Sequence, residues 1–165
     1  MTLAKANGQK LDERELNLIQ YEKVKPLLIC ADSKSEEEAR IINIVSNSKG
    51  ISSIAFLVSN SSQVTLLSKI LPNAKKIKEL SSCELKMPNG VYIGAMLEAK
   101  GLTFDVVYLP FMSEEAFDSL FNEEDDLEAA RSIYTGINCA SKFLGVIYSG
   151  NLTKHLECVL GKFER

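Results

Sequence analysis

The chain has 165 residues, of which 45% are apolar and 25% are charged, and its formal net charge is -3. This length and balance are those of one globular domain with a sizeable core. The acidic total argues against a free-standing nucleic-acid binder, because phosphate contacts supply most non-specific affinity. The sequence has no long apolar run and no secretory leader. We therefore expect no membrane segment and a cytoplasmic location.

Residues that usually carry metal or covalent chemistry are sparse. The four cysteines form no C-x-x-C pair: Cys30, Cys83, Cys139 and Cys158. This spacing predicts reduced thiols and neither a zinc site nor a disulfide framework. The single histidine is His155, which excludes a histidine-rich metal site. The acidic run 123–126 lacks the spacing of a calcium loop, and we interpret it as the start of a helix. No metal site is expected.

The sequence pattern predicts a connecting segment followed by a domain. Residues 1–25 are polar and lysine-rich, with one short helix predicted over 12–21, and we interpret them as a linker or a broken-off connection. The domain is expected to occupy residues 26–165. It opens with a buried strand at 26–30. Ser35 and Glu38 have the spacing of a capping box, which predicts a helix from there to about Gly50.

The remaining pattern alternates strands and helices. Strands are predicted at 53–58, 91–95, 104–109 and 143–148. The first of these leads through a polar turn into a helix that ends by Pro72. A longer helix is predicted from Asn122 to Ser141, with apolar residues on its inner face: Leu127, Ala130, Tyr134 and Ile137. Such alternation predicts a three-layer α/β fold, a mostly parallel sheet with helices on both faces.

The segment 98–110, EAKGLTFDVVYLP, is the most informative in the chain. Lys100 and Gly101 form a polar turn just before an apolar, β-branched strand. A tight turn of this kind brings the backbone close to an anionic ligand. The plain alternative is a surface loop before a buried strand. The patterns G-x-x-x-x-G-K-[ST] and G-x-G-x-x-G are absent, so the chain has no phosphate-cradling loop of its own.

This segment resembles motif V of the UvrD/Rep-type helicases, T-x-H-x-A-K-G-L-E-F-D-x-V. Two further segments resemble motifs of the same family in the same order. Residues 54–63, IAFLVSNSSQ, are similar to motif IV, I-A-V-L-x-R-T-N-x-Q. Residues 133–140, IYTGINCA, are similar to motif VI, L-Y-V-A-x-T-R-A. The resemblance covers most of the chain from about residue 26 and implies the second, C-terminal RecA-like motor domain, a P-loop NTPase fold without a P-loop.

The resemblance also implies site residues. Lys100, Gly101 and Thr103 would contact the nucleotide, although Thr103 replaces the glutamate of motif V. Ala95 and Leu97 replace the threonine and histidine that the family associates with single-stranded DNA.

The arginine positions depart further from the family. Ser59 and Cys139 replace the arginines of motifs IV and VI that reach the γ-phosphate of ATP. Neither can supply a positively charged fork, so no catalytic residue is expected in this chain. Arg131, about two helical turns before Cys139, is an alternative source of charge.

The implied cofactors are ATP and Mg²⁺, in the context of a full-length motor only. There the partners would be an upstream P-loop domain and single-stranded DNA, and the isolated chain should neither hold a cofactor nor hydrolyse ATP. The alternative is a degenerate, non-catalytic module that binds a protein partner or regulates one. A small-molecule enzyme is a third hypothesis, for which the sequence offers no credible catalytic set.

Overall fold

The computed structural model describes residues 26–48, 50, 52–80, 86–117 and 126–157. The linker expected at 1–25, with its short helix, and most of the acidic run at 123–126 lie outside these residues. No helix in the described part of the chain is long and apolar enough to cross a membrane.

In the described part of the chain six strands form one sheet in the order β1-β6-β5-β2-β4-β3, and every pair of neighbours in it is parallel. The strands are β1 (Pro26–Ala31), β2 (Ser53–Val58), β3 (Lys75–Lys76), β4 (Gly90–Ala95), β5 (Phe104–Leu109) and β6 (Ala140–Ser149). The helices are α2 (Lys34–Ser48), α3 (Ser61–Ile70), α4 (Asp126–Asn138) and α5 (Lys154–Glu157), with single-turn helices η2 (Ile77–Glu79) and η3 (Met96–Ala99).

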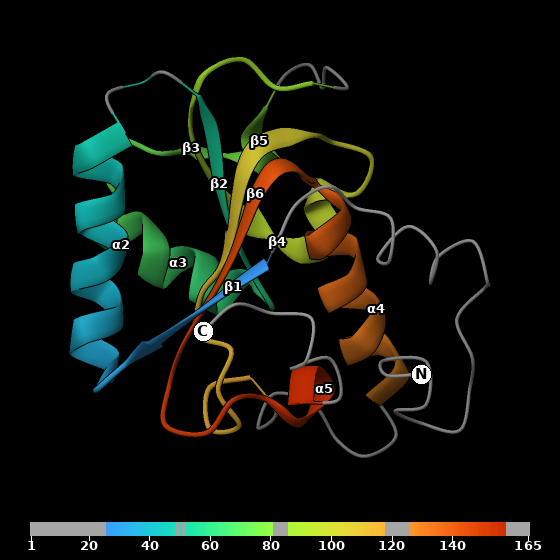
Figure 1. The fold of residues 1–165 in the computed structure, drawn as a ribbon. Coiled ribbons are helices and arrows are strands. Elements are labelled where there is room, and N and C mark those ends of the chain that lie inside the picture. Colours follow the sequence, from blue (N-terminus) through green and yellow to red (C-terminus); the bar gives the residue numbers. More distant parts are fainter. Residues whose placement is uncertain (1–25, 49, 51, 81–85, 118–125, 158–165) are drawn as a thin grey trace.

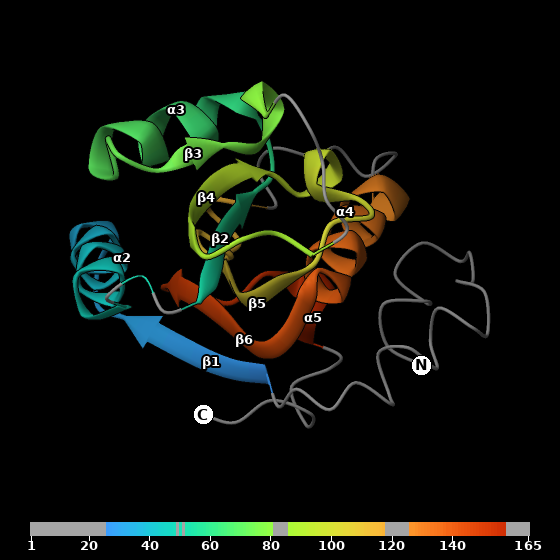
Figure 2. The ribbon, with the colours of Figure 1, turned by 90° about the horizontal axis from the view of Figure 1, so that it is seen from above.

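Helices cover both faces of the sheet, so the molecule has three layers. Figures 1 and 2 show α2 and α3 over one face and α4 over the other. On the first face Ile41 and Leu67 belong to a cluster with Phe56 of β2. On the second face Ile133 and Met96 belong to another cluster, with strand residues such as Leu57, Val107 and Leu109. The predicted α/β fold class is confirmed.

The start of α2 differs from the prediction. The Glu36 amide donates to Ser33 Oγ at 3.2 Å, and the Asp32 amide donates to Glu36 Oε2 at 2.6 Å. The capping pair is therefore Ser33 and Glu36 instead of Ser35 and Glu38. The S-x-x-E spacing occurs twice here, and the helix starts from the copy that directly follows β1.

The end of the long helix was predicted too late in the chain. Residues 139–141 leave the helix, since α4 ends at Asn138 and β6 begins at Ala140. The Phe104 amide donates to the Cys139 carbonyl at 2.8 Å, so contact with β5 replaces the helical bonds at this point. No proline marks the stop, and the glycine nearest to it, Gly136, lies inside α4. The short elements β3, η2 and η3 are also not predicted by the sequence pattern.

Candidate functional site

Residues Ala99 to Leu102 form a β-turn just before β5. The Leu102 amide donates to the Ala99 carbonyl at 2.9 Å. Lys100 has φ -55° and ψ 126°, and Gly101 has φ +86°. These angles are those of a type II turn, whose third residue needs a positive φ and is therefore usually glycine. The turn leaves the Lys100 side chain exposed to solvent.

Gly101→Val is expected to lower the free energy of unfolding by about 1–2 kcal/mol, because a β-branched residue is strained at positive φ. No atom lies within 4 Å of a Cβ added at Gly101, so the cost is conformational and not steric. Lys100→Ala, at the exposed neighbouring position, should unfold within about 0.5 kcal/mol of the parent. Urea unfolding measures both. Equal stability of Gly101→Val and the parent would mean that the turn does not need this backbone conformation.

The turn and α4 together enclose a groove of about 620 Å³, which we call the basic groove. The η3 helix and its connection to β5 line one side of the basic groove with Leu97, Lys100, Gly101, Leu102 and Thr103. The helix α4 and the residue after it line the other side with Arg131, Tyr134, Thr135, Asn138 and Cys139. The segments that resemble motifs V and VI therefore meet in one place.

The basic groove carries positive charge. Lys100 and Arg131 are both exposed, and among the described residues neither forms an ion pair. No carboxylate belongs to the described lining. The Asn138 Oδ1 is buried there without a hydrogen-bond partner in the described part of the chain. Two cations, with no carboxylate among the described residues that line it, make this groove suitable for an anion such as a phosphate.

Cys139 lines the basic groove but turns its thiol inward. Its side chain is 2% exposed, and its one S–H is within donating distance of two carbonyl oxygens, that of Ala99 at 3.3 Å from Sγ and that of Thr135 at 3.2 Å. Burial raises the pKa of the thiol to about 12, so it stays neutral. Because Ala99 also closes the β-turn, Cys139 ties the end of α4 to the segment that resembles motif V. This residue is a structural link and cannot act as a cation.

Ser59 lies at the carboxyl ends of the strands, away from the basic groove at their amino ends. It follows the last residue of β2, whereas Thr103 and Cys139 directly precede β5 and β6. Since the sheet is parallel, these positions are separated by the length of a strand, about 20 Å for six residues. The Ser59 amide donates to Gln63 Oε1 at 3.0 Å, while its Oγ is buried without a partner in the described residues. The structure does not bring the two replaced arginine positions together.

The candidate DNA positions carry apolar side chains. Ala95 ends β4, and its amide donates to Glu98 Oε1 at 2.9 Å. Leu97 follows in η3 and is 50% exposed, so it adds an apolar rim to the basic groove. Neither side chain can donate a hydrogen bond to a phosphate. Thr103 is half-buried, and its carbonyl accepts from the Met87 amide at 3.0 Å.

Asp105 fixes the strand that follows the turn. Its Oδ2 accepts from the Ser53 amide at 3.1 Å, and its own amide donates to Ser53 Oγ at 2.8 Å. Its Oδ1 lies 3.5 Å from the Lys142 ammonium. The carboxyl is nearly buried, and the hydrogen bond from the Ser53 amide, with smaller help from Lys142, lowers its pKa. The aspartate of the motif V segment therefore joins β5 to β2 and lies outside the groove.

Some site residues are not singled out by the motif pattern. Asn138 and Tyr134 enter the basic groove because they lie one helical turn apart on α4, a periodicity that the sequence shows but does not assign to a ligand. Arg131 is reached only as an alternative to Cys139. Among the described residues no cluster of three or more histidine, cysteine, aspartate or glutamate side chains is arranged to hold a metal ion.

A parallel sheet covered by helices on both faces, with the motif V and motif VI segments meeting at one groove, is the arrangement of a RecA-like domain. The family model of the UvrD-like helicase C-terminal domain matches residues 3–151. The chain therefore belongs to the family of UvrD-like helicase C-terminal domains.

A solved structure has the same fold. It is the C-terminal domain of a possible DNA helicase from Lactobacillus plantarum WCFS1, with a TM-score of 0.65 and 17% sequence identity. The alignment covers 93% of this chain and 96% of that one. At this identity the likeness concerns the fold alone. No curated protein matches the chain.

Proposed function

We propose that this domain forms one wall of the ATP cleft in a DNA helicase motor whose upstream domain carries the P-loop. The observation that carries the proposal is the basic groove, where Lys100 and Arg131 lie beside the β-turn of residues 99–102, which we call the motif V turn, and no carboxylate belongs to the described lining. Charged donors of this kind stabilise phosphate oxygens when two domains close on a nucleotide. ATP and Mg²⁺ would be held mainly by the upstream domain, and closure would help to move single-stranded DNA.

The residues present fit phosphate binding better than catalysis. Lys100 and Arg131 are suited to an anion, but the inward thiol of Cys139 occupies the position of the motif VI arginine. Arg131 lies on the same helix and lines the same groove, so it is the residue of this chain that can supply a guanidinium there. The chain alone should show no ATP turnover above buffer.

Titration with sodium triphosphate tests the proposal without the missing domain. The amide signals of Lys100, Gly101 and Thr103 should shift in a saturable way in NMR spectra of the labelled chain. Lys100→Ala and Arg131→Ala should each weaken binding by about three- to tenfold, since each removes one charge-assisted contact. Lys69→Ala, an exposed lysine on α3, is the matched control and should bind as the parent. Absence of saturable shifts, or equal losses in the control, would contradict the proposal.

A second candidate function is a non-catalytic interaction module. The buried, neutral thiol of Cys139 favours it, because the segment that carries an arginine in the family is here part of the packing. This candidate predicts no triphosphate binding at the basic groove and no binding of a single-stranded oligonucleotide near physiological salt. Saturable triphosphate binding that depends on Arg131 would exclude it.

A further inference from the structure

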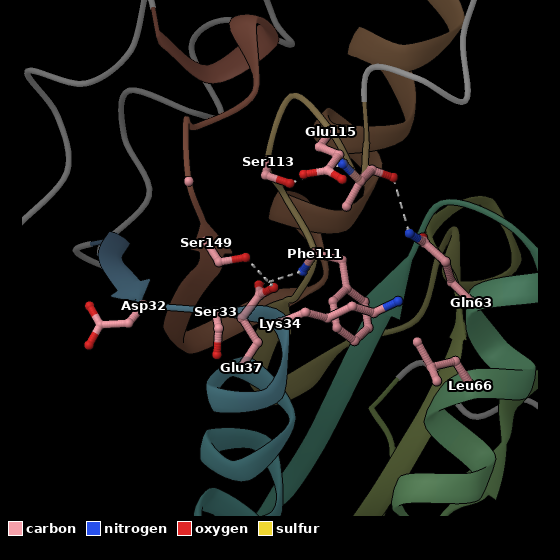
Figure 3. Close-up of a pocket in the computed structure, with 12 residues that line it drawn as sticks. Asp32, Ser33, Lys34, Glu37, Gln63, Leu66, Phe111, Ser113, Glu115 and Ser149 are labelled. Atoms are coloured by element: carbon pink, nitrogen blue, oxygen red, sulfur yellow. Dashed lines mark hydrogen bonds between the residues drawn. The ribbon is translucent and has the colours of Figure 1, made fainter.

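A second hollow lies at the opposite edge of the sheet from the motif V turn, where β1, β5 and β6 end. It has a volume of about 500 Å³, and we call it the carboxyl-edge cavity. Asp32 directly follows β1, Ser149 is the last residue of β6, Phe111 follows β5 by two residues, and Glu37 lies on α2 (Figure 3). Ligands of parallel α/β sheets bind outside the carboxyl ends of the strands. The position and size of the cavity are those of a ligand site.

The floor of this cavity is a buried carboxylate. Glu37 is 1% exposed, and its two oxygens accept from the Phe111 amide at 3.3 Å and from the Ser149 hydroxyl at 3.1 Å. Both donors are neutral, and among the described residues no cation forms an ion pair with Glu37. Buried carboxylates are normally paired with a cation, since an unpaired buried charge is costly. A carboxylate also has acceptor capacity beyond two bonds.

Lys34 does not fill this role. Figure 3 shows its side chain extending past the Phe111 ring toward Gln63, whereas the Glu37 carboxylate points to Ser149 and the Phe111 amide. Burial raises the pKa of Glu37, against the lowering effects of the Ser149 and Phe111 hydrogen bonds and of Lys34. Lys34 thus favours the charged form of Glu37 from a distance, but among the described residues no cation forms an ion pair with this carboxylate.

The walls around this floor fit an organic cation. Three carboxylates and one ammonium line the cavity, those of Asp32, Glu37, Glu115 and Lys34. The described residues contain no metal-binding cluster. Phe111 and Leu66 supply apolar surface, on which the aliphatic stem of a long basic side chain can pack while its head meets the carboxylate. An arginine fork suits this arrangement because it forms two parallel hydrogen bonds with one carboxylate.

The backbone at the cavity floor has an unusual conformation at Phe111. Phe111 is buried and has φ +61°, the only positive φ of a non-glycine residue among those described. Its amide is the one that donates to Glu37. Residues other than glycine seldom adopt this conformation, and strain of this kind persists where the surrounding structure holds it. Glu37 and the Phe111 turn therefore stabilise one another at the cavity floor.

We propose that the carboxyl-edge cavity binds an arginine side chain of a partner protein, with Glu37 as its counter-ion. The site is separate from the basic groove and has the opposite charge, so it recognises a cation where the groove recognises an anion. Nucleic acid is disfavoured at this edge, because three carboxylates repel phosphate.

The probe is the peptide acetyl-Gly-Arg-Gly-amide, titrated into the whole labelled chain, with the amide signals of Phe111 and Ser149 as the readout. We expect saturable shifts at these two residues and none at Gly101. Glu37→Gln should weaken binding by at least about tenfold, because it removes a buried charge from the pair. The rim variant Glu115→Gln should weaken it less. Glu114→Gln, the neighbouring exposed acid outside the cavity, is the control and should bind as the parent.

Three outcomes would overturn the proposal. They are absence of saturable shifts, equal shifts with acetyl-Gly-Gln-Gly-amide, and unchanged affinity in both Glu37→Gln and Glu115→Gln. Thermal unfolding of each variant separates lost binding from lost folding, and Glu115→Gln keeps the test valid if Glu37→Gln does not fold. Since the triphosphate titration reads the turn at Lys100, failure of one site is distinguishable from failure of the other.

Discussion

Gly145→Val is expected to lower the free energy of unfolding by about 3 kcal/mol, because overpacking a closed site costs energy that the neighbouring rings cannot easily relieve. A Cβ at Gly145 would lie 2.7 Å from Tyr108 Cδ1 and 3.2 Å from Phe143 Cε2. Tyr108 faces Gly145 across the β5–β6 pair and stacks on Phe56 with ring centroids 5.3 Å apart. The glycine therefore leaves the space in which this row of rings packs.

A double-mutant cycle checks this cause. In a Tyr108→Leu background the ring is gone, so Gly145→Val should cost clearly less than in the parent. Urea unfolding of the four proteins gives the coupling energy. If the valine costs the same in both backgrounds, the ring contact is not the reason, and a general disturbance of β6 must be sought.

Asp105→Ala should remove about 1–3 kcal/mol of stability at neutral pH, since it leaves the buried Ser53 amide without its acceptor. Asp105→Asn keeps an acceptor oxygen for that amide and should cost less. Both variants lose the contact with the Lys142 ammonium, which is 3.5 Å away in the parent. Equal stability of Asp105→Ala and the parent would show that the Ser53 amide finds another partner.

The contribution of Asp105 should also depend on pH. Its pKa is lowered in the folded protein, chiefly by the hydrogen bond from the Ser53 amide. The stabilisation is then fully present above the unfolded value of about 4 and is lost as the pH falls through the folded value. The stability difference between the parent and Asp105→Asn should therefore shrink as the pH falls from about 5 to 3. Glu37, whose pKa is raised, is common to both proteins and cancels in this difference. A constant difference across this range would contradict the lowered pKa.

Strong local signals were sufficient for much of the fold. The strand at 104–109 is predicted with its observed bounds, because an apolar β-branched run lies between Gly101 and Pro110. The α3 helix ends before Pro72 as predicted, and Asn60 caps it by accepting from the Gln63 amide at 3.1 Å. Weak signals gave errors. β3 has two lysines and no apolar run, so it is recognised only through its pairing with β4.

The sequence also predicts only part of the two sites. The motif V turn is predicted because glycine at positive φ leaves a sequence signal. The separation of Ser59 from Cys139 is not predicted by the motif pattern. It arises because Ser59 follows a strand and Cys139 precedes one, which places them at opposite ends of a parallel sheet. Glu37 lies in a run of three glutamates that reads as a solvated helix start, and only the packing of α2 on β6 shows that this one is buried.

The strand order has a consequence for how the chain folds. Among the described strands β1 lies at the edge of the sheet with β6 as its one neighbour, so Pro26 pairs with Leu144 although nearly the whole described chain separates them. Contacts between such distant residues form late, because closing a long loop costs entropy before any contact can form and offset that cost. During synthesis β1 can pair with β6 only after β6 has been made. A chain shortened before Ala140 would leave both β1 and β5 with an open edge, a surface that favours association with other chains.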